Sequence, residues 1–299
     1  MSQTLSPSAK RPYGLAQVCR VWELARSTVY AAQTRAANPA RELKRRGPKT
    51  RWTDSALTEQ MREVLAASPF VGEGHRKVWA RLRARGVRTS KARVLRLMRE
   101  AELLAPTRVG RAHGPAAHDG TIITDRPDVM WGTDATSCFT RLEGMATIFV
   151  AVDHWAAECL GIHAAKYGTR FEALEPIRQG VRAAFGAYES GTAQGLRVRH
   201  DHGSQYMSDH FQDELAFLGI ESSPAFVREP EGNGCAERFI RTLKEQLLWV
   251  QTFDTVEELR RALLAFKARY NQEWLIQRHG HQTPAAVRAA YTAAIGAAA

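Results

Sequence analysis

Apolar residues near the start of the chain are spaced as on two short helices. Val18 and Val21 recur at helical intervals within residues 15–34, and Ser27 is placed to cap the second helix. Two short helices with a tight joint indicate a helix-turn-helix, although any helical hairpin has this pattern. The next segment, residues 36–53, is basic and lacks apolar periodicity, so we expect a linker there.

A second and stronger helix-turn-helix candidate is expected within residues 54–105. Asp54 is placed to cap its first helix, Gly86 to end its second and Ser90 to cap its third. The third helix carries four basic residues with few acids near its start, as a helix in a DNA major groove requires. The basic residues of the second helix are expected to face outward: Arg76, Lys77, Arg81, Arg83 and Arg85.

After a segment rich in proline, glycine and alanine, the pattern changes to that of strands. Runs of β-branched and aromatic residues predict a hairpin with its turn at residues 141–144, then three more strands interleaved with helices. An amphipathic helix follows, and Trp249 at its end is expected in the core. This order indicates an α/β fold with a mixed five-stranded sheet covered by helices, behind all-α helix-turn-helix domains. The expected divisions are 1–35, 36–53, 54–105, a linker at 106–127, a core at 128–250 and a helical end at 251–299.

Composition excludes several classes of protein. Apolar residues make up 44% and charged residues 24% of the 299 positions, which fits a folded chain and not a disordered one. No apolar run approaches the roughly 18 residues of a membrane span, and the N-terminus lacks a secretory pattern. The four cysteines contain no CxxC pair, which argues against a zinc module or a disulfide scaffold. We therefore expect a cytoplasmic protein without membrane contact.

Charge is divided unevenly along the chain. Residues 1–120 carry 24 lysines and arginines against 9 acidic residues, whereas residues 121–299 carry 18 against 22. A net charge of +15 ahead of −4 favours a nucleic-acid partner over a merely solvated basic surface. The basic segment at residues 36–53 either lies along a phosphate backbone or is a solvated tether, and its sequence favours neither. The expected DNA-binding residues of this half are Lys44, Arg45, Arg46, Lys91, Arg93, Arg96 and Arg99.

Three carboxylates fall where such a sheet would bring them together. Asp134 is in the middle of the first strand, inside an apolar run where an unpaired carboxylate is costly. Asp201 ends the fourth strand at a glycine-containing turn, the usual place for a site in an α/β sheet. Glu237 lies near the start of the amphipathic helix. Polar residues share its helix face: Asn233, Arg241 and Lys244.

Converging carboxylates of this kind point to a hard cation. They raise one another's pKa unless divalent cations neutralise them, and Mg²⁺ prefers oxygen ligands. Two such ions, about 3.5–4 Å apart, activate an attacking oxygen and stabilise a leaving oxygen at phosphorus. Beside a basic front half, two Mg²⁺ ions, with Mn²⁺ as an expected substitute, predict phosphodiester chemistry on DNA.

Three motifs carry a resemblance to a known family. They are WGTDAT at residues 131–136, DHGSQY at residues 201–206 and GNGCAER at residues 232–238, with Lys244 seven positions beyond Glu237. Together they resemble the retroviral-integrase-like DDE transposases of bacterial insertion sequences. The nearest group is the one whose transposase is often made from two overlapping reading frames, with the core in the second. The resemblance covers about residues 70–290, the second helix-turn-helix included.

The resemblance implies a ribonuclease H-like core in which Asp134, Asp201 and Glu237 bind Mg²⁺ and form the catalytic triad. It implies DNA cleavage and strand transfer at the element's terminal repeats, with Arg241 and Lys244 beside the DNA. Because joining two ends needs at least two protomers, we expect a multimer on the element ends and target DNA, at the bacterial nucleoid. A first-frame protein is a further expected partner.

Two positions depart from the family pattern. His200 stands where a serine commonly precedes the second aspartate, and WLI at residues 274–276 replaces a common Arg-Pro-His. These departures leave the triad intact and affect only the expected local DNA contacts.

Other functions remain open on the sequence. One is a DNA-binding protein without catalysis, such as a repressor of the element, which would bind DNA without cutting it in any metal. Another is a ribonuclease H-type nuclease acting on RNA–DNA hybrids, which the helix-turn-helix candidates disfavour because a major-groove helix does not read A-form hybrids. Each acid also has a purely structural alternative: an ion pair for Asp134, a turn cap for Asp201 and a first-turn helix acid for Glu237.

Overall fold

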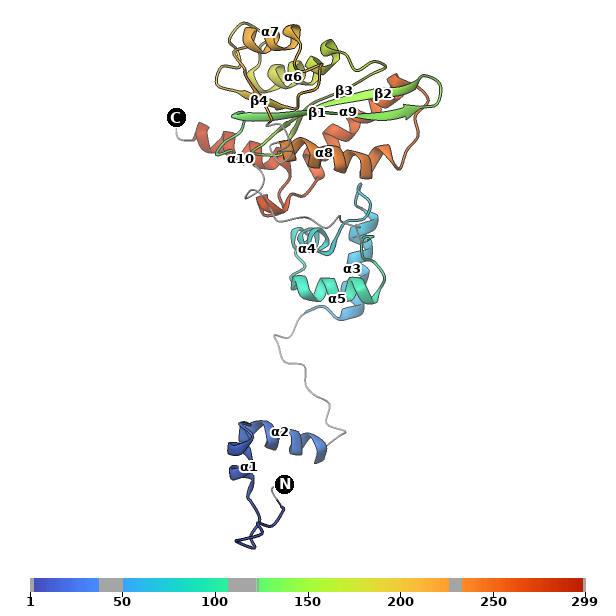
Figure 1. Ribbon diagram of the computed structural model, residues 1–299. Helices are drawn as coiled ribbons and strands as arrows, with labels where there is room; N and C mark the ends of the chain where they lie inside the picture. Colours follow the sequence, from blue (N-terminus) through green and yellow to red (C-terminus); the bar gives the residue numbers. More distant parts are fainter. Residues whose placement is uncertain (1–2, 38–50, 107–121, 123, 226–232, 298–299) are drawn as a thin grey trace. The chain divides into compact units, whose positions relative to one another are not determined.

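A computed structural model describes residues 3–37, 51–106, 122, 124–225 and 233–297 (Figure 1). The chain forms two compact units, Met1–Arg51 and Trp52–Ala299. The first unit holds α1 (Leu15–Val21) and α2 (Arg26–Ala37), so Ser27 lies inside the first turn of α2 and does not cap it. Within these two helices Cys19 alone is buried, because so short a pair has little surface to cover its own apolar residues.

The second unit begins with three helices around a small apolar core. They are α3 (Asp54–Ala66), α4 (His75–Ala84) and α5 (Lys91–Glu100). Ser90 caps α5 as predicted, with its hydroxyl accepting the Arg93 backbone N–H. Thr53, and not Asp54, caps α3, because the threonine hydroxyl accepts the Ala56 N–H and Asp54 is already the first helical residue. The buried side chains come from all three helices: Leu57, Met61, Val64, Val78, Leu82, Val94, Leu97 and Met98.

Part of α4 contacts the end of α9 (Val256–Glu273) and the turn that follows it. The Lys77 ammonium lies 2.8 Å from the ring centroid of Trp274, and Arg76 donates to the Gln277 side chain at 2.9 Å. Arg81 binds the buried Glu73 carboxylate at 2.6 and 2.9 Å. The expectation that the basic residues of α4 face outward is therefore wrong for Lys77 and Arg81, whereas Arg76 is exposed as expected. Their partners lie up to about 200 positions away, where helical periodicity carries no information.

A mixed five-stranded sheet forms the centre of the second unit, as predicted. Its strands are β1 (Met130–Thr140), β2 (Gly144–Asp153), β3 (Cys159–Ala165), β4 (Arg197–His200) and β5 (Glu221–Pro224). Their order across the sheet is β3-β2-β1-β4-β5. The first three pair antiparallel, whereas β4 pairs parallel with both β1 and β5.

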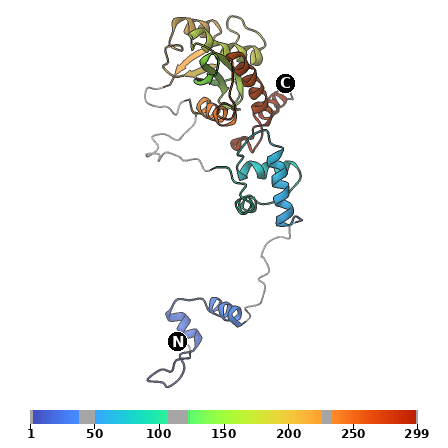
Figure 2. The ribbon, with the colours of Figure 1, turned by 90° about the vertical axis from the view of Figure 1, so that its right-hand side faces the viewer.

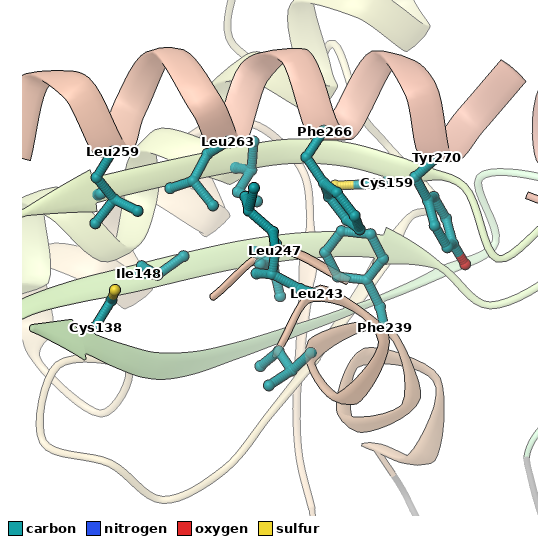
Figure 3. Close-up of a cluster of buried hydrophobic side chains, with 14 of the residues drawn as sticks. Cys138, Ile148, Cys159, Phe239, Leu243, Leu247, Leu259, Leu263, Phe266 and Tyr270 are labelled. Carbon is teal, nitrogen blue, oxygen red and sulfur yellow. The ribbon is translucent and has the colours of Figure 1, made fainter. Parts of the chain in front are cut away.

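Helices cover both faces of this sheet (Figures 1 and 2). On one face lie α6 (Arg170–Phe185) and α7 (Asp209–Phe217), packed on Trp131, Phe149 and Val198. On the other lie α8 (Gly234–Leu243), the π-helical turn η2 (Lys244–Leu248) and α9 (Val256–Glu273). Figure 3 shows side chains of α8 and α9 meeting those of the strands, with Phe239 and Phe266 facing each other. After η3 (Gln277–His279), α10 (Pro284–Gly296) ends the described chain.

Two further observations concern surface and solvent. The Trp249 side chain is 70% exposed, so its prediction as a core residue is wrong: the π-helical turn before it changes which residues face the sheet. Among the helices in the described ranges, none has both the length and the apolar character that a membrane crossing demands.

Candidate active site

Asp134 lies in the middle of β1, opposite Val150 of β2. Its Oδ1 accepts the backbone N–H of Ala135 at 2.8 Å. Burial raises the pKa of the Asp134 carboxyl to about 6, against a usual 3.8. The negative charges of Asp201 and Glu237 add to the increase, whereas the Ala135 N–H and the positive charge of Lys244 oppose it. A bound cation would favour the ionised form of this carboxyl and lower its pKa again.

Asp201 is brought beside Asp134 by the register of two parallel strands. Gly132 of β1 pairs with Arg199 of β4, and each aspartate lies two residues beyond its member of this pair. The Asp201 carboxylate is exposed, and its Oδ1 accepts the Gly203 N–H at 2.8 Å in the turn after β4. The strand thus delivers the second acid to the same level of the sheet as the first.

Glu237 belongs to the first turn of α8, which packs on β1 and β2 through its apolar face. The residue is exposed, and partial desolvation raises the pKa of its carboxyl. Lys244 lies seven residues on, two helical turns away on the same face, and its charge acts on Asp134. The helix therefore presents a carboxylate and a cation to the region where the two aspartates meet.

The donor set fits a hard divalent cation in its chemistry. Three carboxylates supply oxygen ligands, and their mutual repulsion is visible in the raised pKa of Asp134, where it adds to burial. Among the residues that the structure describes, no three His, Cys, Asp or Glu side chains are arranged to hold one ion. Ligation of one ion by all three acids therefore requires side-chain movement from the arrangement seen here.

The predicted DNA-binding residues have different surroundings. Arg93 and Arg96 both bind the Asp54 carboxylate, which joins α5 to the start of α3. Arg99 is exposed, and the Lys91 ammonium lies 4.4 Å from the ring centroid of Trp79. Arg241 pairs with Glu245 one turn along, at 3.1 Å, on the surface. The three linker residues fall outside the described residues: Lys44, Arg45 and Arg46.

Both departures from the family pattern have structural explanations. His200 is fully buried, its Nδ1 lies 2.7 Å from the Asp201 carbonyl, and its Nε2 lies 2.9 Å from the Ser222 hydroxyl. Burial lowers its pKa, so a neutral ring joins β4 to β5. Trp274 packs edge-on against Phe70 of the helix-turn-helix region, with ring centroids 4.9 Å apart. Neither residue therefore needs a DNA contact to explain its presence.

One residue of the site has a role that the sequence did not indicate. Helical spacing placed Asn233 on the face of Glu237, yet it is the residue before α8 and its side chain turns to the sheet. Its Nδ2 donates to the Thr133 carbonyl of β1 at 2.9 Å. The one signal in the sequence was an asparagine directly before a helix. That signal predicts a hydrogen bond to the helix as an N-cap, and not a contact with the sheet.

Known proteins match this chain in both of its main regions. A family model described as an HTH-like domain matches residues 52–111, and one described as an integrase core domain matches residues 218–284. The transposase for insertion sequence element IS629 from Shigella sonnei is 27% identical over 297 residues, which is 96% of this chain and 95% of the relative. The transposase assigned to element IS986/IS6110 from Mycobacterium tuberculosis is 30% identical over 254 residues, 80% of this chain and 89% of the relative.

A solved structure gives a weaker likeness. The HTLV-2 integrase catalytic core domain in complex with magnesium has a TM-score of 0.42 at 18% identity, over 55% of this chain and 98% of that one. The family assignment therefore rests on the family models and the relatives. The mixed five-stranded sheet with helices on both faces agrees with the ribonuclease H-like core expected from the sequence. The chain belongs to the insertion-sequence transposases that combine a helix-turn-helix region with an integrase core, which are polynucleotidyl transferases.

Proposed function

We propose that this transposase binds the terminal repeats of its element and cuts and joins DNA with Asp134, Asp201 and Glu237 as metal ligands. The observation that carries the proposal is the convergence of Asp134, Asp201 and Glu237, which follows from the parallel register of β1 with β4 and from the packing of α8 on β1 and β2. It joins a strand centre, a strand end and a helix start that are far apart in sequence. Ion pairing or turn capping does not account for all three acids gathering at one place.

The chemistry divides between the cation and the residues of the chain. Two divalent ions, Mg²⁺ or Mn²⁺ in its place, would supply charge stabilisation at phosphorus when held by these carboxylates. Lys244 adds a fixed positive charge beside Asp134, suited to a DNA phosphate. Water attacks the phosphodiester at the element end, and the bond to the 3′ oxygen breaks, leaving a 3′-hydroxyl. That hydroxyl then attacks target DNA, forming a new ester and releasing a target 3′-hydroxyl.

The other regions have roles in DNA binding. The helices within residues 54–105 bind the terminal repeats, with Lys91 and Arg99 the α5 residues best placed for phosphates. The basic linker at 36–53 and the helices of 1–35 extend the DNA contacts, and residues 106–127 connect them to the core at 128–250 and the helical region at 251–299. Two protomers or more assemble on the paired ends, and a first-frame protein is a further partner in this proposal.

The test uses DNA from the borders of the element that encodes this chain. Wild-type protein is incubated with it in Mg²⁺, Mn²⁺ or EDTA, beside Glu237→Gln and a control, Glu257→Gln. Glu257 is an exposed α9 acid paired only with neighbouring arginines in the described chain, so its change leaves the site intact. We expect metal-dependent cutting and joining in wild type and control, lost at least 100-fold in Glu237→Gln. Binding without cutting in any metal would instead support a repressor.

A further inference from the structure

One buried amide joins the strand of Asp134 to the helix of Glu237. Asn233 is 6% exposed and is the N-cap residue of α8, but its side chain makes no hydrogen bond to the helix. Asparagine at an N-cap ordinarily accepts a backbone N–H of the first turn. Here the side chain reaches the sheet, where Nδ2 donates to the Thr133 carbonyl at 2.9 Å. The residue therefore acts between two elements and not within one.

Both ends of this hydrogen bond adjoin proposed metal ligands. Thr133 directly precedes Asp134 in β1, and Asn233 precedes Glu237 by about one helical turn. Backbone between each pair is regular, so a displacement at the amide moves one carboxylate relative to the other. The bond thus links the backbone next to the strand ligand with the backbone at the start of the helix that carries the other ligand.

The strand is shaped to admit this side chain. A Cβ atom at Gly132 would come within 2.5 Å of Asn233 Oδ1 and 3.1 Å of His154 Nε2. Any larger residue at 132 would therefore push the amide away from β1. His154 is fully buried in the turn after β2, and its Nδ1 lies 3.1 Å from the Ile122 carbonyl. Burial lowers the pKa of His154, so a neutral ring closes the space on this side.

We propose that Asn233 is a positioning residue that sets the distance between Asp134 and Glu237 for divalent-metal binding, an inference that rests on the proposed triad. The rest of α8 is held independently, because Phe239, Ile240 and Leu243 are buried in the core. Loss of the amide therefore displaces the first turn of α8 without unfolding the helix. Outer-shell groups of this kind typically change metal affinity or activity by about 10–100-fold.

The test compares matched changes at two buried asparagines. Asn233→Asp keeps the shape but turns an oxygen toward the Thr133 carbonyl, and Asn233→Ala removes the bond without that repulsion. Asn271→Asp is the control: Asn271 of α9 holds the Cys159 backbone with two hydrogen bonds of 2.9 Å, and neither residue adjoins a proposed metal ligand in the sequence. Three quantities are measured on the full chain. They are the rise in Tm with added Mg²⁺ or Mn²⁺, the affinity for border DNA in EDTA, and the joining rate at saturating DNA.

We expect Asn233→Asp to weaken apparent Mg²⁺ affinity and slow joining about 10–100-fold, with DNA affinity unchanged and partial rescue by high Mn²⁺. Asn233→Ala shows a smaller loss in the same direction, and Asn271→Asp lowers Tm in EDTA with wild-type metal affinity. Wild-type metal affinity in both Asn233 variants, or equal weakening in Asn271→Asp, would overturn the positioning role. A wild-type protein that gains no Tm from either metal and joins no DNA would overturn the triad itself.

Discussion

At the scale of single residues, the site is defined by a carboxylate that the fold makes hard to ionise. Asp134 is half-buried in a strand, and burial with two neighbouring acids raises its pKa to about 6. The usual pKa of this carboxyl is 3.8, so between about pH 4 and pH 6 Asp134 holds more proton in the folded chain than in the unfolded chain. The contribution of Asp134 to stability is therefore lost as pH rises from about 4 through 6. A function that places a cation there explains why the acid is kept.

Asp134→Asn removes this pH-dependent loss. In EDTA we expect the variant to match wild type near pH 4 and to exceed its free energy of unfolding by about 1–3 kcal/mol at pH 8. Asp153, whose pKa burial also raises to about 6, is present in both proteins and cancels in the comparison. Urea unfolding at the two pH values measures the difference. The same difference at both pH values would show that ionisation of Asp134 has no such cost.

At the scale of elements, local patterns predicted the helices and strands well and their tertiary partners poorly. Apolar spacing placed α8 and α9, and β-branched runs placed the β1–β2 hairpin, because both signals are local. The pairing of Asp54 with Arg93 and Arg96 was not predictable, since about 40 residues separate the partners and Asp54 also suits a helix cap. Basic residues on one helix consequently looked alike in sequence but have different neighbours in the fold.

This difference predicts that replacing one arginine of α5 changes stability, whereas replacing another changes DNA binding. Arg93 donates to Asp54 and to the Trp52 carbonyl, so Arg93→Ala should lower the free energy of unfolding by about 1 kcal/mol. Arg99 is exposed, so Arg99→Ala should leave stability unchanged, weaken border-DNA binding and reduce the salt slope by about one. Chemical unfolding and anisotropy titrations at several salt concentrations separate the two. Equal stability of both variants would contradict the structural role of Arg93.

At the scale of the whole molecule, the chain joins a basic region with a helix-turn-helix domain to a slightly acidic integrase core. The charge asymmetry and the three acidic motifs were sufficient to predict this division from the sequence, and the triad itself stays a prediction. The positioning of the triad was not predictable. The Asn233 amide donates to the Thr133 carbonyl 100 residues away, and this contact needs the space left by the missing side chain of Gly132. Such contacts depend on strand order and on which helix face meets the sheet, and both are set by packing of the complete core.

In the proposed function, Asp134, Asp201 and Glu237 together hold divalent metal. Electron paramagnetic resonance of free Mn²⁺ measures this directly when the full chain is titrated beside Asp134→Asn, Asp201→Asn, Glu237→Gln and the control Glu257→Gln. We predict that each triad variant binds Mn²⁺ at least 10-fold more weakly than wild type, whereas the control binds as wild type does. Wild-type Mn²⁺ binding in all three triad variants would contradict the account.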